Sequence, residues 1–311
     1  MSTTTNQANL KAFSAVDLLS RYHTILLDAF GVITNTEGAI PGAIEFIDHL
    51  NASHTPYFIL TNGASKLPKS MSAFFKKRGL NIPEQNIITS GSLLKSYFDH
   101  LDASEKYPLR ALVIGTPESS EYAKLAGATI APPQAPPEEI DAILICDEDD
   151  KNFIPTIDHA LSTMIYRLEH NLPLKLVLSN PDTYYPRGEN YYGITSGAIA
   201  AILESIIRER YHGLITNILP PSFVNLGKPQ SMIFIEAFRR LGLDPMLASD
   251  KQKVVMVGDQ LKTDILGANN FGIDSALVGT GVGKLDLSQE LSRKLTPTHI
   301  LPHGLKLSLN R

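Results

Sequence analysis

The sequence predicts an α/β fold that is built on a parallel β-sheet and leaves room for a second α/β domain. Short apolar runs lack the polar alternation of half-exposed strands, which is typical of strands covered on both faces. Stretches of helical periodicity separate these runs, as crossover helices separate the strands of a parallel sheet. Acids that directly follow apolar runs indicate where a functional site lies, because ligands of such sheets bind beyond the carboxyl ends of the strands.

The expected strands are rich in Ile, Leu and Val, and two expected helices are followed by glycines at C-cap positions, Gly79 and Gly242. We expect strands at 24–27, 57–61, 87–89, 111–115, 142–146, 175–179, 254–258 and 275–278. We expect helices at 43–50, 69–78, 92–100, 154–169, 196–210 and 231–241.

The composition is that of a globular protein with a full core: 311 residues, 43% hydrophobic and 19% charged, with a formal net charge of −4. This balance gives no electrostatic reason to expect nucleic acid or a membrane as a partner. The polar first residues lack the apolar core of a secretory signal, and no apolar run approaches the ~20 residues of a membrane span. We therefore expect a cytoplasmic protein. The single cysteine, Cys146, is expected to be a small buried hydrophobe.

Carboxylates follow two of the apolar runs. Asp28 follows TILL, and Asp259 follows KVVMVG, with Asp264 five residues further on. Taken singly, each could cap a helix or complement a helix dipole. Taken together, they offer the oxygen ligands that Mg²⁺ prefers, and carboxylates crowded this closely need a cation between them. The set therefore predicts a Mg²⁺ site.

Other residues complete a chemical pattern around Asp28. A carboxylate can attack a phosphate monoester and form an aspartyl-phosphate that water later hydrolyses. Thr61, at the end of YFILT, can donate its hydroxyl to a phosphoryl oxygen, and Lys228 can offset transition-state charge. Gly31 permits a tight turn after Asp28. Taken singly, Thr61 could be a turn residue and Lys228 a solvated charge.

The ordered set resembles the four motifs of the haloacid dehalogenase (HAD) superfamily. The matching residues, in chain order, are Asp28 with Gly31, Thr61, Lys228, and Asp259 with Asp264. The stretches GAIPGAIEFIDHL, FILTNGAS, LSNPDTYYP and LGKP narrow the resemblance to the NagD-like, nitrophenylphosphatase-like branch, subfamily IIA. The resemblance extends from about His23 to Gly279. It implies a Mg²⁺-dependent phosphatase that acts on a small phosphorylated metabolite.

The resemblance also implies a Rossmann-like core with a cap domain inserted between the second and third motifs, a C2-type cap. The spacing agrees, because the interval from Thr61 to Lys228 has room for an α/β domain. We expect the core at 1–102 and 217–311 and the cap at 103–216. The strands near 111, 142 and 175 would form the sheet of the cap. Caps of this branch often form dimers, so a homodimer through the cap stays open.

Four further residues are substrate-binding candidates by the resemblance. Asn62 and Gly63 follow Thr61, whereas Asn180 and Asp182 in SNPD match the cap motif. SNPD could equally be an ordinary turn. The tyrosines of 183–193 could stack on a flat ligand or pack against the core.

Phe30 departs from the family pattern. Most phosphatases of this superfamily carry at that place a second aspartate, which acts as general acid and then as general base. A phenylalanine cannot transfer the proton, whereas its backbone carbonyl can still bind the metal. Positioned acid–base catalysis contributes ~10²–10⁴-fold, so we expect slow turnover of alkyl phosphates and a smaller effect on aryl or acyl phosphates.

This departure leaves alternatives open. One is a catalytically weak or inactive HAD-like protein that binds a phosphorylated ligand. Another is a dehalogenase, which also lacks the second acid, but such enzymes need no metal and lose a carboxylate of the fourth motif, whereas this chain keeps Asp259 and Asp264. A phosphonatase-like reaction uses a cap before the second motif, where the spacing leaves no room for one.

Overall fold

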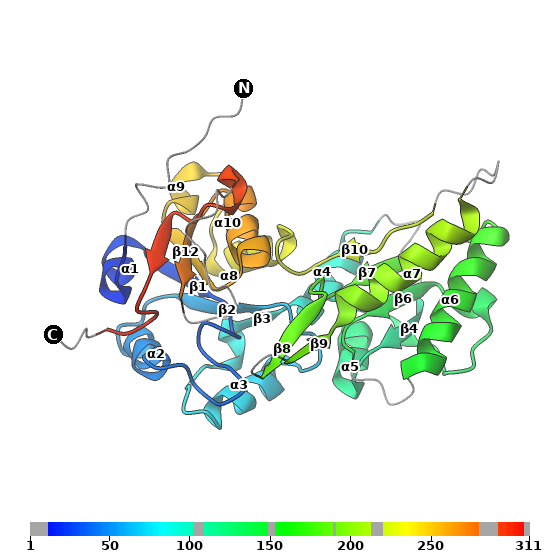
Figure 1. Cartoon of the computed structure of the whole chain (residues 1–311), viewed down its shortest axis with the longest axis horizontal. Coiled ribbons are helices and arrows are strands. Elements are labelled where there is room, and N and C mark those ends of the chain that lie inside the picture. The colour runs from blue at the N-terminus through cyan, green and yellow to red at the C-terminus, as the bar shows by residue number, and fades with distance from the viewer. Residues whose placement is uncertain are drawn as a thin grey trace. The chain divides into compact units, whose positions relative to one another are not determined.

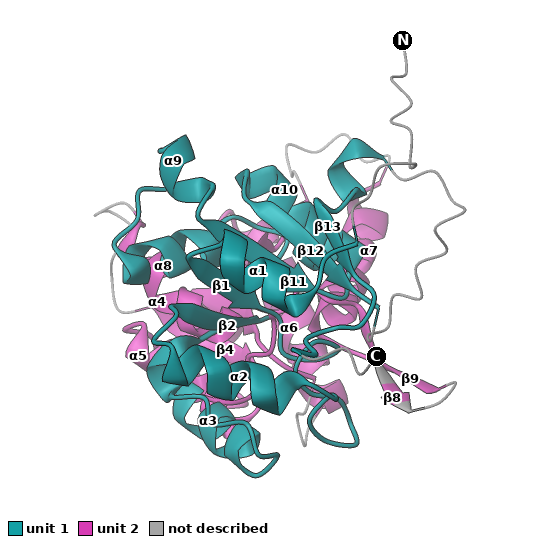
Figure 2. Cartoon of the chain, turned by 90° about the vertical axis from the view of Figure 1, so that its left-hand side faces the viewer, with its two compact units in different colours: residues 1–61, 68–88, 228–311 teal, residues 62–67, 89–227 magenta. Residues whose placement is uncertain are grey.

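The structure is a computed structural model that describes residues 12–101, 109–148, 153–188, 191–212, 220–279 and 292–307. The chain divides into two compact units (Figure 2). Unit 1 comprises residues 1–61, 68–88 and 228–311, and unit 2 comprises residues 62–67 and 89–227. The domain borders predicted near residues 103 and 216 lie outside the described residues and stay a prediction.

Unit 1 is built on a six-stranded sheet (Figure 1). The strand order is β13-β12-β11-β1-β2-β3, and the strand pairs described for it are parallel. The strands are β1 Thr24–Leu27, β2 Tyr57–Thr61, β3 Ile87–Thr89, β11 Val254–Gly258, β12 Asp274–Val278 and β13 His299–Leu301. Because β1 and β11 are buried along their whole length, both faces of the central strands are covered, which explains their unbroken apolar runs.

The helices of unit 1 supply the core that covers this sheet. Phe46 and Ile47 of α2 pack in one buried cluster with Ile25 and Leu27 of β1. The helices are α1 Ala15–Arg21, α2 Ala43–Ala52, α3 Pro68–Lys76, α8 Met232–Leu241, α9 Ala248–Lys251 and α10 Leu266–Phe271. Short 3₁₀ turns span Glu84–Asn86 and Arg293–Leu295, and a π-helical turn spans Leu261–Ile265 directly before α10.

Unit 2 is a second α/β unit with a five-stranded parallel sheet of order β10-β7-β6-β4-β5. Its strands are β4 Arg110–Ile114, β5 Thr129–Ile130, β6 Ala142–Ile145, β7 Lys175–Leu178 and β10 Val224–Asn225, and β8 Tyr184–Gly188 and β9 Tyr191–Ile194 form a separate antiparallel hairpin. Its helices are α4 Leu93–Asp99, α5 Pro117–Leu125, α6 Phe153–Glu169 and α7 Ser196–Tyr211, with 3₁₀ turns at Ser90–Ser92 and Pro137–Glu139.

The α/β prediction is confirmed, and every predicted strand and helix is present to within two residues at each end. The sequence patterns missed the elements that are short or polar. These are α1, α5, α9, α10, β5, β8, β9, β10 and β13. Cys146 is buried as predicted. The alternative that the tyrosines of the hairpin pack against the core is wrong, since Tyr184 and Tyr191 are 61% and 74% exposed.

Among the described residues, no helix has the length and apolar character needed to cross a membrane. The cytoplasmic location and the homodimer stay predictions.

Candidate active site

The register of the unit 1 sheet brings the predicted acids to one edge. Leu27 of β1 pairs with Val257 of β11 on one side and with Ile59 of β2 on the other. Because these strands are parallel, the residues that follow them leave the sheet at the same edge. The backbone N–H of Asp28 continues the pairing by donating to the carbonyl of Val257 over 2.9 Å.

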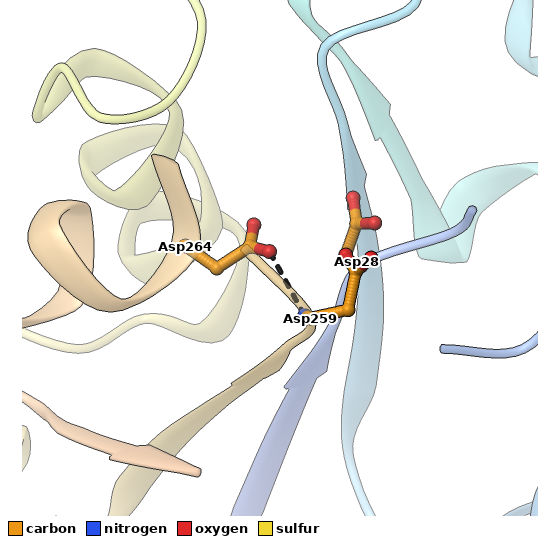
Figure 3. Close-up of side chains that lie close together, drawn as sticks. All are labelled: Asp28, Asp259 and Asp264. Atoms are coloured by element: carbon orange, nitrogen blue, oxygen red, sulfur yellow. Dashed lines mark hydrogen bonds between the residues drawn. The ribbon is translucent and has the colours of Figure 1, made fainter. Parts of the chain in front are cut away.

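Three carboxylates meet at this edge. Asp28, Asp259 and Asp264 each offer one oxygen, and these oxygens lie within 4.8 Å of one another (Figure 3). All three side chains are buried. The π-helical turn before α10 places Asp264, whose carboxylate accepts hydrogen bonds from the backbone N–H groups of Asp259 at 3.2 Å and Gln260 at 3.1 Å. Residues separated by more than 200 positions in the sequence therefore form one acidic cluster.

Two glycines give the carboxylates room. A Cβ atom at Gly31 would lie 2.3 Å from Oδ2 of Asp259, and the φ of +92° at Gly31 is itself a conformation that favours glycine. A Cβ atom at Gly258 would lie 2.2 Å from the Cβ of Asp264. Both distances are far shorter than any normal contact, so larger residues would displace the acids.

Lys228 joins two of the three carboxylates. Its Nζ lies 2.5 Å from Oδ1 of Asp28 and 2.7 Å from Oδ1 of Asp264, and the side chain is 2% exposed. Burial alone lowers the pKa of this ammonium, but Asp264 and Asp28 more than offset it, so the pKa lies above its ordinary value. Lys228 is therefore a permanent cation within the cluster.

The surroundings of Asp28, the candidate nucleophile, favour its neutral form instead. Burial raises the pKa of Asp28 to about 7, against the lowering effect of Lys228, and the charge of Asp264 adds to the rise. When all three carboxylates are ionised, the one ammonium among them leaves two negative charges in a buried space. A single divalent cation would neutralise that excess, and a hard cation such as Mg²⁺ takes carboxylate and carbonyl oxygens as ligands. The donor set therefore fits Mg²⁺.

Thr61 and Phe30 lie in the same unit and differ in their surroundings. Thr61 is the last residue of β2 and is buried. Phe30, two residues after Asp28, is 47% exposed. Its ring centroid lies 6.0 Å from that of Phe74 in α3, and the guanidinium of Arg78 covers the Phe74 ring at 3.6 Å. An aromatic side chain thus stands where the family pattern has an acid.

The four predicted substrate-binding residues belong to unit 2 and form one connected group. Asn62 Nδ2 donates to Oδ1 of Asp182 over 3.1 Å, and Oδ1 of Asn180 accepts from the backbone N–H of Asp182 at 3.0 Å. The second bond is an Asx-turn, so SNPD does form the turn that the sequence left open. Gly63 is the neighbour of Asn62 in the segment 62–67.

Sequence reasoning missed two residues that continue this group. Asn180 Nδ2 donates to the Thr195 hydroxyl over 3.2 Å, and that hydroxyl donates to Oε2 of Glu148 over 2.7 Å. Glu148 follows the apolar run of β6 closely, so the rule of acids after strands could have found it. Thr195 carried no such signal, because its role depends on the tertiary position of α7.

A parallel α/β unit that holds three acids and a lysine at one sheet edge, and that is interrupted by a second α/β unit, defines the class of an HAD-like hydrolase. A family model described as "Haloacid dehalogenase-like hydrolase" matches residues 25–129, and one described as "HAD-hyrolase-like" matches residues 225–306. The crystal structure of a possible sugar phosphatase of the HAD superfamily from Cytophaga hutchinsonii is 30% identical, with a TM-score of 0.77 over 97% of this chain and 100% of that chain. The chain belongs to the haloacid dehalogenase superfamily.

Two further relatives are similar over most of their length. The acid sugar phosphatase of Staphylococcus epidermidis is 26% identical over 282 residues, which are 90% of this chain and 95% of the relative. NagD from Escherichia coli K-12 shares the fold, with a TM-score of 0.70 over 93% of this chain and 99% of NagD at 22% identity. The expected NagD-like resemblance is confirmed.

Proposed function

We propose that this chain, a phosphatase of the HAD superfamily, hydrolyses small phosphorylated metabolites of the sugar phosphate class through an aspartyl-phosphate on Asp28. The names of the relatives from Staphylococcus epidermidis and Cytophaga hutchinsonii support the substrate class. The observation that carries the proposal is the buried cluster of Asp28, Asp259 and Asp264 with Lys228. Structural acids are seldom buried in such a group, because their mutual repulsion costs free energy.

Each residue of the cluster has a separate task. A carboxylate oxygen of Asp28 attacks phosphorus, the bond from phosphorus to the ester oxygen breaks, and the leaving alcohol takes its proton from water. Water then attacks the phosphorus of the aspartyl-phosphate and releases inorganic phosphate. Lys228 and the Thr61 hydroxyl stabilise the charge on the phosphoryl oxygens. We assign substrate binding to Asn62, Gly63, Asn180 and Asp182 by the family pattern.

Mg²⁺ would be held by Asp28, Asp259, Asp264 and the backbone carbonyl of Phe30. When bound, it supplies a Lewis acid that neutralises phosphoryl charge and lets an anionic nucleophile meet an anionic ester. With all three acids ionised, the single ammonium of Lys228 leaves the cluster with an excess of negative charge for the cation.

Phe30 limits the range of good substrates. With no titratable side chain at this position, the leaving group departs without a positioned proton donor. Phosphates whose leaving group is a weak base, such as a phenolate or a carboxylate, need such a donor least, so aryl and acyl phosphates should react fastest.

A second candidate function rests on the same residue. The exposed ring of Phe30 in place of a general acid favours a protein that binds a phosphorylated ligand and turns it over weakly or not at all. Such a protein would keep the acidic cluster that holds the metal, but it would lack the residue that transfers a proton to the leaving group.

A substrate screen separates the two functions. Purified chain is incubated with sugar phosphates, nitrophenyl phosphate and acetyl phosphate, with Mg²⁺ and with chelator, and released phosphate is measured. Mg²⁺-dependent release supports the phosphatase. Calorimetric binding of phosphate esters without any release supports the binding protein, and Mg²⁺-independent halide release from a haloacid would support the dehalogenase alternative.

A further inference from the structure

The segment 62–67, which we call the post-Thr61 segment, is held to the rest of unit 2 by side-chain hydrogen bonds to five of its residues. Four of its carbonyls accept hydrogen bonds and one of its N–H groups donates. The pairs are Ser90 Oγ to Asn62 O at 2.5 Å, Ser119 Oγ to Ala64 O at 2.9 Å, Thr116 Oγ1 to Ser65 O at 2.7 Å, Tyr122 OH to Lys66 O at 2.6 Å, and Leu67 N to Glu118 Oε2 at 2.7 Å.

Most of these donors come from the first turns of one helix. Thr116 is the N-cap of α5, and Ser119 and Tyr122 follow at intervals of three residues, so all three lie on one face of the helix. Thr116 and Ser119 also form a capping box with each other, which fixes their hydroxyls. We call this set the α5 face. It presents three hydroxyls to three successive carbonyls, those of Ala64, Ser65 and Lys66.

Tyr122 is the most constrained member of the α5 face. Its hydroxyl lies 2.6 Å from Oγ1 of Thr89 and 2.6 Å from the carbonyl of Lys66. A carbonyl only accepts, so Tyr122 donates its proton to Lys66 and accepts from Thr89. Burial raises the pKa of Tyr122, which keeps the hydroxyl protonated. A Cβ atom at Gly91 would lie 2.5 Å from the ring, so Gly91 provides the space in which the ring is held.

These bonds orient the other side of the segment. In a trans peptide, the carbonyl of one residue and the N–H of the next point in opposite directions in one plane. Ser90 holds the carbonyl of Asn62, and the N–H of Gly63 therefore points away from Ser90. Peptide N–H groups held in this way bind anions without the cost of ordering a loose loop.

We propose that the α5 face positions the post-Thr61 segment for recognition of the phosphoryl group, with Tyr122 as its principal positioning residue. The proposal rests on the proposed function only in that Asn62 and Gly63 contact the phosphoryl group. Tyr122 itself touches neither substrate nor metal. Its effect reaches the phosphoryl group through the backbone that follows Thr61 in the chain.

The test compares Tyr122→Phe with Tyr211→Phe. Both changes remove one hydrogen-bonded tyrosine hydroxyl from unit 2, but the Tyr211 hydroxyl bonds to Glu169 and not to the post-Thr61 segment. Calorimetry measures the binding of inorganic phosphate in excess Mg²⁺, and hydrogen exchange follows the amides of residues 62–67. Tyr122→Phe should weaken the binding of phosphate about three- to tenfold, which is the equivalent of one neutral hydrogen bond. It should also speed the hydrogen exchange of these amides. Mg²⁺ affinity should not change.

A second pair keeps the test valid if Tyr122→Phe folds poorly. Thr116→Val removes the hydroxyl that bonds to the Ser65 carbonyl and should weaken the binding of phosphate. Thr116→Ser retains a hydroxyl and should bind phosphate as tightly as the unmodified chain does. Unchanged phosphate affinity in both Tyr122→Phe and Thr116→Val overturns the inference, as does equal weakening in Tyr211→Phe. Phosphate binding without ester hydrolysis in the unmodified chain would instead count against the proposed function alone.

Discussion

The two units carry polar residues at the carboxyl ends of parallel strands, yet the two edges differ in charge. In unit 1, Lys228 and Asp28 form a buried ion pair within an acidic cluster. In unit 2, Asn180, Thr195 and Glu148 form a chain of hydrogen bonds that contains one carboxylate. Buried charges that repel one another are retained where chemistry uses them, whereas a satisfied hydrogen-bond chain shapes a surface. The proposed function thus assigns chemistry to the edge in unit 1 and recognition to the edge in unit 2.

The sharpest way to break this comparison is to remove one strand-end acid from each unit. Asp28→Asn should reduce phosphate release from nitrophenyl phosphate by about a thousandfold or more, because an amide cannot act as the nucleophile. Glu148→Gln, which alters the one carboxylate of the hydrogen-bond chain in unit 2, is the matched control and should stay within about tenfold. Steady-state rates at saturating Mg²⁺ provide the measurement. Similar losses in both variants would remove the distinction between the two edges.

A gain of function at Phe30 tests the missing acid. Phe30→Asp should raise turnover of sugar phosphates by about a hundredfold relative to nitrophenyl phosphate, because alkoxide leaving groups benefit most from a positioned proton donor. The measurement is the ratio of kcat/KM for the two substrates. Phe30→Asn, which is similar in size and cannot donate an acidic proton, is the control. An equal gain on both substrates contradicts the leaving-group argument.

The glycines of the acidic cluster allow a test of metal binding that replaces none of the proposed ligand residues. Gly31→Ala would put a Cβ atom 2.3 Å from Oδ2 of Asp259 and should lower the affinity for Mg²⁺ about 10–100-fold. Gly127→Ala in unit 2 is the control, since Gly127 has a φ of +93°, close to the +92° of Gly31, and no atom within 4 Å of the added Cβ. Backbone strain is therefore matched, and only the crowding differs. Comparable Mg²⁺ constants in the two variants would contradict the proposed metal site.

The sequence predicted the acidic edge better than the recognition edge, for a physical reason. Asp28 and Asp259 follow unbroken apolar runs, and parallel pairing brings the ends of such strands together whatever the details of packing. The post-Thr61 segment is held instead by side chains that bond to backbone carbonyls, and such bonds depend on where α5 lies in three dimensions. α5 itself, PESSEYAKL, is too polar to be detected by its periodicity. Phe30 was visible as a departure, but its packing against Phe74 was not.

The smallest expected effect is a pH dependence of Mg²⁺ binding at the acidic edge of unit 1. Burial raises the pKa of Asp28 from an ordinary 3.8 to about 7 in the metal-free protein, and Mg²⁺ binds only the ionised carboxylate. Below about pH 7 a proton therefore competes with the metal, and the apparent Mg²⁺ affinity should fall by about tenfold per pH unit.

The same shift predicts the opposite dependence for the metal-free protein. A raised carboxyl pKa means that the folded state retains a proton that the unfolded chain releases, so the free energy of unfolding should decrease as the pH rises from about 4 to about 7. Thermal unfolding with chelator and with Mg²⁺, at pH 5 and pH 7.5, measures both trends. Mg²⁺ should stabilise the protein more at pH 7.5, and Asp28→Asn should remove most of that difference. A pH-independent effect of Mg²⁺ would show that the cation binds without displacing a proton from Asp28. The ammonium of Lys228 would then suffice to keep Asp28 ionised.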